Sequence, residues 1–280
     1  MREVNVGLIT DCIRNLSIEA NYFLGSDIKE ALEKSRKEET WHLAGDVLDK
    51  IIVNSEIASS EKIPMCQDTG MACVFLEIGQ DVHFVGGNLE EAINEGIRRG
   101  YEEGFLRKSV VQDPIHRVNT KDNTPAIIYY DIVDGDKVKI TLAPKGFGSE
   151  NMSKIGMLKP SDGLEGVKKF ILDTVKAAGP NPCPPMVIGV GIGGTFDKAA
   201  YLAKKALIRP INIRNKDEFY RKLEEEMLEE VNKLGIGPQG FGGKTTALGL
   251  NIETYPTHIA GLPVAVNINC HATRHKEIVI

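Results

Sequence analysis

The chain has 280 residues, of which 42% are hydrophobic and 26% are charged, a composition typical of a globular protein with a substantial core. Acidic residues outnumber basic ones by 39 to 34, which gives a formal net charge of −5. This balance argues against nucleic acid as the main partner, because phosphate binding needs a basic surface. It leaves room for a local basic pocket that binds a small anionic substrate.

The N-terminal segment does not have the composition of a targeting sequence. Charged residues are spread through the first thirty positions, which leaves no place for the apolar core of a signal peptide. No apolar run approaches the roughly 20 residues that a membrane helix needs. The sequence therefore predicts a cytoplasmic protein that does not cross a membrane.

The first sixty residues have the periodicity of helices. Apolar residues recur at intervals of three and four over residues 6–20, which predicts an amphipathic helix. Ser26 stands at the expected N-cap of a second helix, and residues 41–52 mark a third. A short and almost wholly apolar strand is predicted next, over residues 71–78.

The middle of the chain combines a helix with two strands. Asn88 and Glu91 form a capping pair for the helix that follows them. The apolar segments 125–133 and 137–142 bracket Asp134-Gly135, a dipeptide that favours a tight turn between paired strands. We therefore expect an antiparallel hairpin here.

The second half alternates between strands and helices. Helices before mixed strands and helices predict a mixed α/β (α+β) architecture, with a helical N-terminal segment followed by mixed sheets, an antiparallel hairpin and flanking helices. Residues 1–280 are expected to form one domain without a separate linker. The sequence also allows this domain to consist of two lobes. The predicted elements are a helix over 164–178, a strand over 186–190 that runs into a glycine loop, helices from Asp197 and over 216–234, and strands over 247–252 and 263–268.

Two glycine-rich segments resemble nucleotide-binding motifs. Residues 189–194 match G-x-G-x-x-G between a strand and a helix, but no acidic residue follows at the expected distance of about 20 residues. Gly243-Lys244 resembles the end of a P-loop, but the position of its earlier glycine is Pro238. Backbone N–H groups of both loops could still bind an anion. A non-catalytic anion- or nucleotide-binding module with structural cysteines is therefore one alternative.

The cysteines are few and widely separated, which argues against a disulfide framework. Two of them are interpreted as core residues, since Cys12 shares the apolar face of the first helix and Cys73 lies inside an apolar strand. The other three lie in polar or proline-bounded loops beside predicted strands: Cys66, Cys183 and Cys270.

Three loop thiols are compatible with more than one chemistry. They could be unrelated free cysteines, or they could share a metal. Three thiolates on a cubane iron–sulfur cluster would leave one iron open as a Lewis acid toward hydroxyl and carboxylate oxygens. Tetrahedral zinc, with His258 or His271 as the fourth ligand, would compete with this interpretation.

Long motifs add a family resemblance. The segments PMCQDTG, KGFGSENMS, NPCPP with VGIGGTFDKA, and GGKTTALGLNIETYPTHIAGLPVAVNINCHATRH resemble those of the class I fumarate hydratase and L-tartrate dehydratase family. They cover nearly the whole chain and correspond to the alpha subunit, or to the N-terminal half of single-chain enzymes. The resemblance implies a [4Fe–4S] cluster held by Cys66, Cys183 and Cys270.

The resemblance also implies two catalytic side chains. Asp68 is similar to the carboxylate that transfers a proton at the substrate, and His258 is similar to a histidine that hydrogen-bonds the substrate. From the residues alone, Asp68 could instead cap a turn through Thr69-Gly70, and His258 could satisfy a backbone carbonyl. A solvated basic patch without a catalytic role is expected at His271, Arg274 and His275.

Substrate contacts follow from the same motifs. Gln67 resembles a neighbouring substrate contact, and Gly146 or Gly148 resembles a main-chain contact. Arg107 is similar to the arginine that grips a substrate carboxylate. Lys108 stands where the family usually has a tyrosine, which weakens the alignment at Arg107.

The implied protein is the alpha subunit of a [4Fe–4S]-dependent hydro-lyase that reversibly hydrates fumarate to L-malate. In that family a threonine of the other half is the base, so the resemblance implies a separate beta subunit that completes the active site, and a higher oligomer. L-tartrate is an alternative substrate, because one hydroxyl separates it from malate and only a few side chains discriminate such a group.

Overall fold

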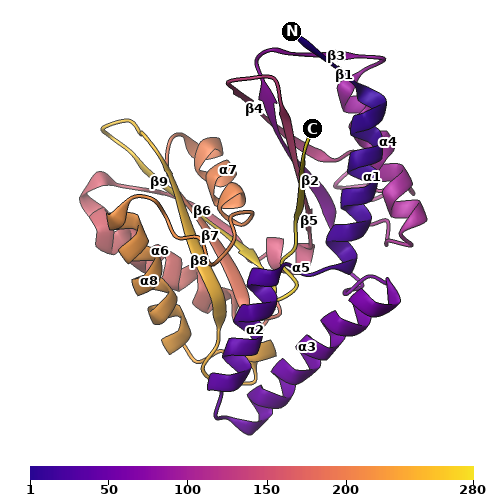
Figure 1. Ribbon diagram of the computed structural model, residues 1–280. Coiled ribbons are helices and arrows are strands. Elements are labelled where there is room, and N and C mark those ends of the chain that lie inside the picture. The colour runs from indigo at the N-terminus through magenta and orange to yellow at the C-terminus, as the bar shows by residue number, and fades with distance from the viewer. The chain divides into compact units, whose positions relative to one another are not determined.

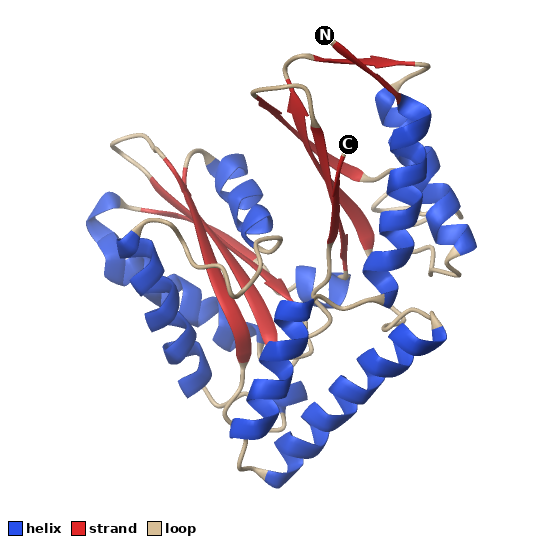
Figure 2. Ribbon diagram, viewed as in Figure 1, coloured by secondary structure: helices blue, strands red, loops and turns tan.

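The computed structural model describes residues 1–280, and the chain divides into two compact units. Unit 1 comprises Met1–Leu24, Asn54–Phe147 and Arg274–Ile280, and unit 2 comprises Gly25–Val53 and Gly148–Thr273. Both units contain helices and mixed sheets, which confirms the predicted mixed α/β class (Figures 1 and 2). None of the helices combines the length and apolar composition that crossing a lipid bilayer requires.

Unit 1 is built on a four-stranded sheet of order β10-β5-β2-β4. A separate parallel pair joins β1 and β3. α1 and α4 pack against each other, and α1 also contacts β5 and β10. The elements are β1 (Arg2–Asn5), α1 (Val6–Tyr22), β2 (Met71–Gly79), β3 (Val82–Val85), α4 (Leu89–Glu103), β4 (Ile127–Val133), β5 (Val138–Lys145) and β10 (Lys276–Val279).

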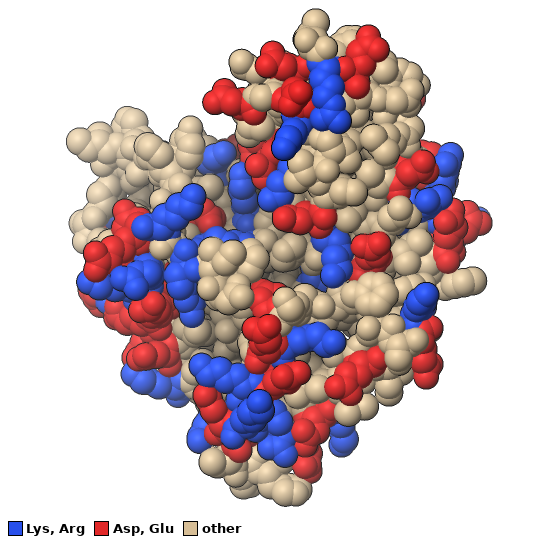
Figure 3. All heavy atoms as spheres, viewed as in Figure 1, with Lys and Arg blue, Asp and Glu red and all other residues tan.

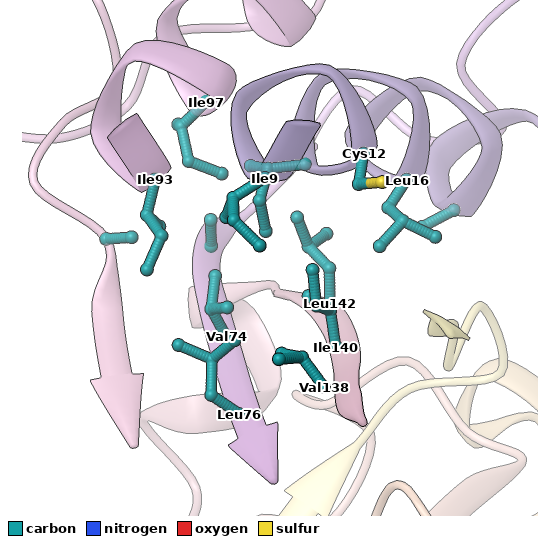
Figure 4. Close-up of a cluster of buried hydrophobic side chains, with 14 of the residues drawn as sticks. Ile9, Cys12, Leu16, Val74, Leu76, Ile93, Ile97, Val138, Ile140 and Leu142 are labelled. Atoms are coloured by element: carbon teal, nitrogen blue, oxygen red, sulfur yellow. The ribbon is translucent and has the colours of Figure 1, made fainter. Parts of the chain in front are cut away.

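The core of unit 1 lies between these helices and the sheet. Figure 4 shows Ile9 of α1 and Ile93 of α4 beside Val74 of β2 and Ile140 of β5, and each of these four side chains is fully buried. Cys12 belongs to the same core, where burial, followed by the charge of Asp11 beside it in the chain, raises the pKa of its thiol. Cys73 in β2 is buried as well, so both cysteines are core residues as predicted.

The predicted hairpin is wrong, because β4 and β5 do not pair. β2 lies between them, parallel to β4 and antiparallel to β5. The connection through Asp134-Gly135 passes over the end of β2, where the Gly79 N–H donates to the Lys137 carbonyl at 2.8 Å. A Cβ on Gly79 would lie 2.3 Å from the Gly135 carbonyl oxygen, so only glycine fits. The nearly wholly apolar β2 takes the central place because a strand buried on both faces needs partners on both edges.

Unit 2 is a four-stranded sheet of order β6-β9-β7-β8. α6 and α8 pack on one face with a large apolar core, and α7 covers the other face (Figure 1). Its elements are α2 (Ser26–Glu38), α5 (Phe147–Glu150), β6 (Lys154–Leu158), α6 (Gly163–Ala178), β7 (Met186–Gly193), α7 (Phe196–Ala206), α8 (Glu218–Lys233), β8 (Ala247–Tyr255) and β9 (Leu262–Asn269), and α3 (His42–Glu61) begins in this unit.

The helix-capping signals are confirmed, except that the N-cap of α2 lies one residue earlier than predicted. α4 begins after Asn88, whose side chain accepts the Glu91 N–H at 3.0 Å as the capping pair predicts. α6 ends at Gly179, which has a positive φ of 53°. In α2 the N-cap is Gly25, and Ser26 is the first helical residue rather than the cap.

The glycine-rich segment expected as a loop is the second half of β7. Ile188 and Val190 point into the core beneath α6 and α8, so Gly189 and Gly191 face α7. A Cβ on Gly189 or Gly191 would lie 2.1 Å from a carbonyl oxygen of α7. These glycines therefore allow the helix backbone to contact the sheet, which explains the motif without a nucleotide.

Glu224 of α8 is a fully buried carboxylate with several partners. Its oxygens accept the N–H groups of Ile252 at 2.8 Å and Asn215 at 3.0 Å, and it forms an ion pair with Arg209. Arg209 also binds Glu253 at 3.0 Å, and burial raises the pKa of the Glu253 carboxyl. A buried charge of this kind is tolerated because each of its partners compensates for lost hydration.

We predict that Glu224→Ala lowers the free energy of unfolding by about 3–5 kcal/mol, because it removes the acceptor of two backbone N–H groups and one of the two carboxylates that pair with Arg209. Urea unfolding curves would measure the change. Glu225→Ala is the matched control, since Glu225 is exposed on the same helix. A loss as small as that of the control would contradict the prediction.

Candidate functional site

The loop between α3 and β2 carries the first of the three loop cysteines. Cys66 is partly exposed, and its Sγ accepts the backbone N–H of Asp68 at 3.4 Å. The Oε1 atom of exposed Gln67 lies 3.6 Å from the same sulfur. A sulfur that receives a backbone N–H is favourably placed to carry negative charge, as a metal-bound thiolate does.

The Asp68 carboxylate is held in one orientation by backbone donors. Oδ1 accepts the Gly70 N–H at 3.1 Å, which is the turn-capping bond expected from the residues alone. Oδ2 accepts the Phe147 N–H at 2.9 Å, so the carboxylate is also tied to the first residue of α5, two residues after β5 ends. A Cβ on Gly146 would lie 3.1 Å from Oδ2, so a larger residue there would crowd the carboxylate. Each carboxylate oxygen retains a further lone pair for a substrate or water.

Buried side chains fix the carbonyl groups of the same loop. The Tyr101 hydroxyl lies 2.7 Å from the Thr69 carbonyl and 3.0 Å from that of Gly70, and burial raises the pKa of this hydroxyl strongly. Asn123 donates to the Gly70 carbonyl at 3.2 Å, and Arg274 donates to the Asp68 carbonyl at 2.5 Å. The loop is therefore fixed through its carbonyls as well as through the carboxylate.

Arg274 departs from the sequence-based expectation. It was predicted to belong to a solvated basic patch, but only 5% of it is exposed. Its position four residues after Cys270 gives no periodicity signal, because the segment between β9 and β10 is irregular. Its contact with residue 68 is a long-range one that only the fold reveals.

The backbone of Arg107 contacts the same loop. The Thr69 hydroxyl donates to the Arg107 carbonyl at 2.9 Å, and the Arg107 side chain is exposed. Unit 1 thus gathers Gln67, Asp68, Arg107 and Gly146 around one loop. Gly148 belongs to unit 2, where it lies in the short helix α5 with open space about its Cα.

In unit 2 the other two loop cysteines lie at one end of the sheet. Cys183 precedes β7 and Cys270 follows β9, and these antiparallel strands pair Val187 with Asn269. The His271 N–H donates to the Cys183 carbonyl at 3.2 Å, which holds the two loops together. We call this the cysteine end of the sheet.

The donor set fits an iron–sulfur cluster. None of the three loop cysteines forms a disulfide, none is buried in the core, and each lies in a loop at a strand end. Neither unit by itself gathers three or more His, Cys, Asp or Glu side chains at metal-binding distance. Cys66 belongs to unit 1, and Cys183 and Cys270 belong to unit 2, so the structure brings two of the three proposed ligands together within a unit.

His258 lies at the opposite end of the unit 2 sheet. It sits in the loop that follows β8, and the register pairs Tyr255 with Gly193, the last residue of β7. β9 then runs back from Leu262 to Asn269 before Cys270 is reached. At about 3.3 Å per residue this strand separates His258 from the cysteine end by roughly 20 Å. Zinc bound by Cys183, Cys270 and His258 of one chain is therefore excluded.

Sequence patterns did not predict a polar network that gives the SENMS segment (residues 149–153) a structural role. Glu150 accepts from Lys204 and from the Asn267 amide, each at 2.6 Å, and Ser153 accepts from the same amide at 2.7 Å. These contacts tie α5 and the start of β6 to α7 and β9. Lys244 of the P-loop-like segment is likewise structural, because its N–H donates to Glu39 at 2.7 Å.

We predict that Arg274→Ala loosens the 66–70 loop, because the Asp68 carbonyl loses a buried charged donor worth about 1.5–3 kcal/mol. Amide hydrogen exchange at Asp68, Thr69 and Gly70 would measure the loss of protection. Arg117→Ala is the control, since Arg117 is exposed in the same unit. Unchanged exchange at these amides would show that Arg274 does not position the loop.

Comparison with known proteins agrees with these features. A family model described as fumarate hydratase (fumerase) matches residues 10–279. A protein of Methanocaldococcus jannaschii named putative L(+)-tartrate dehydratase subunit alpha is 46% identical over 272 residues, covering 95% of each chain. The L(+)-tartrate dehydratase subunit alpha of Escherichia coli K12 is 29% identical over 279 residues, covering 98% of this chain and 91% of its own. The chain therefore belongs to the fumarate hydratase family, and it is a hydro-lyase as its motifs predict.

Proposed function

We propose that this chain is the alpha subunit of a hydro-lyase that reversibly adds water to fumarate to give L-malate. The observation that carries the proposal is the 66–70 loop, which presents a thiol and a carboxylate two residues apart. Backbone N–H groups of Gly70 and Phe147 hold that carboxylate. Membership of the fumarate hydratase family supports the reaction class.

Cys66, Cys183 and Cys270 would hold a [4Fe–4S] cluster. When bound, the cluster supplies an iron without a protein ligand, which acts as a Lewis acid toward the substrate oxygens. Gln67 and Asp68 stand next to the first ligand in the chain, so substrate bound there is within their reach. The other two ligands lie at the cysteine end of unit 2.

The chain's own residues then bind the dianion and move protons. Arg107 and a main-chain N–H near Gly146 or Gly148 hold a substrate carboxylate, which restricts the substrate to a reactive orientation. Asp68, with His258, supplies the general acid that assists departure of the hydroxyl group in the dehydration direction. The fixed carboxylate of Asp68 requires little reorganisation before it transfers a proton.

A separate beta subunit would supply the remaining catalytic groups. The relatives that match nearly their whole length are named as alpha subunits, which supports a second chain. Removal of the C3 proton during dehydration needs a base, and in our proposal Asp68 and His258 act instead on the departing hydroxyl group. The base is therefore assigned to the partner chain.

L-tartrate is the second candidate substrate, and the names of the relatives favour it. Tartrate carries one more hydroxyl group than malate. A site that hydrogen-bonds this hydroxyl rejects substrates that lack it, whereas a site without such a partner discriminates weakly. Relative kcat/KM values for the two substrates therefore decide between the candidates.

We predict about four iron and four acid-labile sulfide atoms per chain in protein purified without oxygen and reconstituted with both elements. The Cys66→Ser, Cys183→Ser and Cys270→Ser triple variant should lose them. A Cys12→Ala and Cys73→Ala double variant is the control, because both thiols are buried core residues. Iron that survives the triple change would overturn the ligand assignment.

We also predict that turnover requires the beta chain. In the complex of both chains, Asp68→Asn should lower kcat about 10²–10⁴-fold, which is the usual contribution of a general acid or base. Asp134→Asn, in an exposed turn of the same unit, should retain activity. Hydration of fumarate would be followed by loss of its ultraviolet absorbance. Full turnover by the alpha chain alone would contradict the two-chain proposal, and a higher kcat/KM for L-tartrate would select the second candidate.

A further inference from the structure

β4 (Ile127–Val133) is an edge strand of the unit 1 sheet and consists almost wholly of apolar and aromatic residues. It pairs with β2 on one side, and no strand of the chain pairs with its other side. Asp131 is its one charged residue, and the strand contains no Pro or Gly. Ile132 is 67% exposed and Tyr130 is 48% exposed. A long apolar edge of this kind is a template for pairing with another strand unless it is protected.

Other sheet edges of the chain are protected. β10, the opposite edge of the same sheet, has four residues and begins with Lys276 and Glu277. β8, an edge of the unit 2 sheet, is covered in part by side chains. The Ile252 N–H donates to Glu224 at 2.8 Å, and Asn215 donates to the Ile252 carbonyl at 2.8 Å. Short strands, charges and covering groups are the usual ways to protect an edge, and β4 is neither short nor covered in this manner.

Hydrogen bonds at its two ends show which backbone groups of β4 point outward. The Gln80 N–H donates to the Val133 carbonyl at 2.8 Å, so the backbone groups of Val133 point toward β2. The Ala126 N–H, just before the strand, instead donates to the Asn94 side chain of α4 at 2.9 Å. The N–H and C=O of one strand residue point to the same side, and this side alternates along the strand. The residues whose backbone groups point away from β2 are therefore Ile128, Tyr130 and Ile132.

The sequence of β4 is nearly symmetric about Tyr130. If a second β4 runs antiparallel to the first with the two Tyr130 residues opposite each other, every residue of the strand has a partner. Apolar residues then face apolar residues, and the acidic residue faces a phenol hydroxyl that donates to it. Residues with outward backbone groups also fall opposite one another, so each such pair exchanges two N–H···O bonds. The opposed pairs are Ile127 with Val133, Ile128 with Ile132, and Tyr129 with Asp131.

Other arrangements of two β4 strands are less favourable. A register centred on Asp131 places two carboxylates opposite each other, and one centred on Tyr129 places Asp131 opposite Ile127. A parallel pair would bring together the acidic turns Asp134-Gly135-Asp136 that follow β4. Figure 3 shows Asp and Glu side chains at the end of unit 1 where Figure 1 places the N-terminus and this turn. The antiparallel pair centred on Tyr130 keeps these turns at opposite ends of the interface.

We propose that β4 pairs with β4 of a second copy of this chain, antiparallel and centred on Tyr130, so that two four-stranded sheets become one continuous sheet. The occupant is a second copy because the strand that complements β4 is its own sequence read in reverse. One two-fold axis relates the copies, so the same residues are used on both sides. The assembly closes at two copies because both outer edges of the joined sheet are the short, charged β10. This interface is independent of the reaction proposed above.

Sedimentation velocity of the full chain over a range of concentrations measures the pairing. Ile132→Lys introduces a charge twice, because Ile132 of each copy lies opposite Ile128 of the other. It should raise the Kd of the dimer roughly tenfold or more. Val279→Lys is the matched control, since Val279 is 53% exposed on β10, outside the interface. A wild-type chain that stays monomeric, or a Kd that Ile132→Lys leaves unchanged, would overturn the proposal.

A disulfide reports the register. Tyr130→Cys places a thiol on the two-fold axis, where the two substituted residues are about 5.5 Å apart between Cα atoms, within reach of a disulfide. Mild oxidation with diamide should therefore link two chains through this position, as a non-reducing gel and peptide masses would show. Ile132→Cys is the control, because its two copies lie about four residues, roughly 13 Å, apart along the strands. Linkage of both variants alike, or of neither, would overturn the register.

Hydrogen exchange separates a second copy from the beta chain as the occupant. Pairing should slow exchange of the Ile128, Tyr130 and Ile132 amides in the chain alone, because their N–H groups point toward the second copy. In Ile132→Lys the amides of Ile128 and Tyr130 should exchange faster, while that of Tyr129, which points toward β2, stays protected. Protection that arises only after the beta chain is added would assign this edge to that chain and overturn the proposal.

Discussion

A strand that is apolar on both faces has to lie inside its sheet, and this constraint organises each unit. β2 and β7 are such strands, and each has a parallel neighbour on one edge and an antiparallel neighbour on the other. The start of the central strand therefore lies beside the end of its antiparallel neighbour. The chain places its chemically distinctive residues at this position in both units.

The two units use that position in the same way. In unit 1 the cysteine loop precedes β2, and Phe147, two residues after the end of β5, supplies the N–H that holds the Asp68 carboxylate. In unit 2 Cys183 precedes β7, and the end of β9 supplies Cys270 and His271. The central strand, its parallel neighbour and its antiparallel neighbour follow one another along the chain in both units, and only the outer strand differs, since β10 comes last in unit 1 and β6 comes first in unit 2. The strand directions nevertheless bring loops from distant parts of the chain together.

Sequence patterns predicted local structure better than pairing. The helix periodicity and the Asn88 cap depend on neighbours in the chain, and both are confirmed. The Asp134-Gly135 turn is real, but whether the strands beside it pair depends on where β2 lies, which no local signal contains. Gly189 and Gly191 looked like a phosphate loop because the contact that requires glycine is made by a helix that follows in the chain. Long motifs supplied the candidate site residues, while the contact of Arg274 with the 66–70 loop became visible only in the fold.

The contacts of the 66–70 loop separate positioning from chemistry. Main-chain N–H groups hold the Asp68 carboxylate, whereas side chains hold the loop's carbonyls. A change at Tyr101 or Arg274 therefore removes a contact of the loop's carbonyls and none of the hydrogen bonds that the carboxylate accepts. In the proposed reaction, a change of Asp68 removes the proton-transferring group, and it also removes the acceptor of the Gly70 and Phe147 N–H groups. Loss of the carboxylate should thus lower both the rate and the stability of the loop, while loss of a peripheral contact should lower stability and affect the rate only through the position of the loop, because the loop and the fold share those hydrogen bonds.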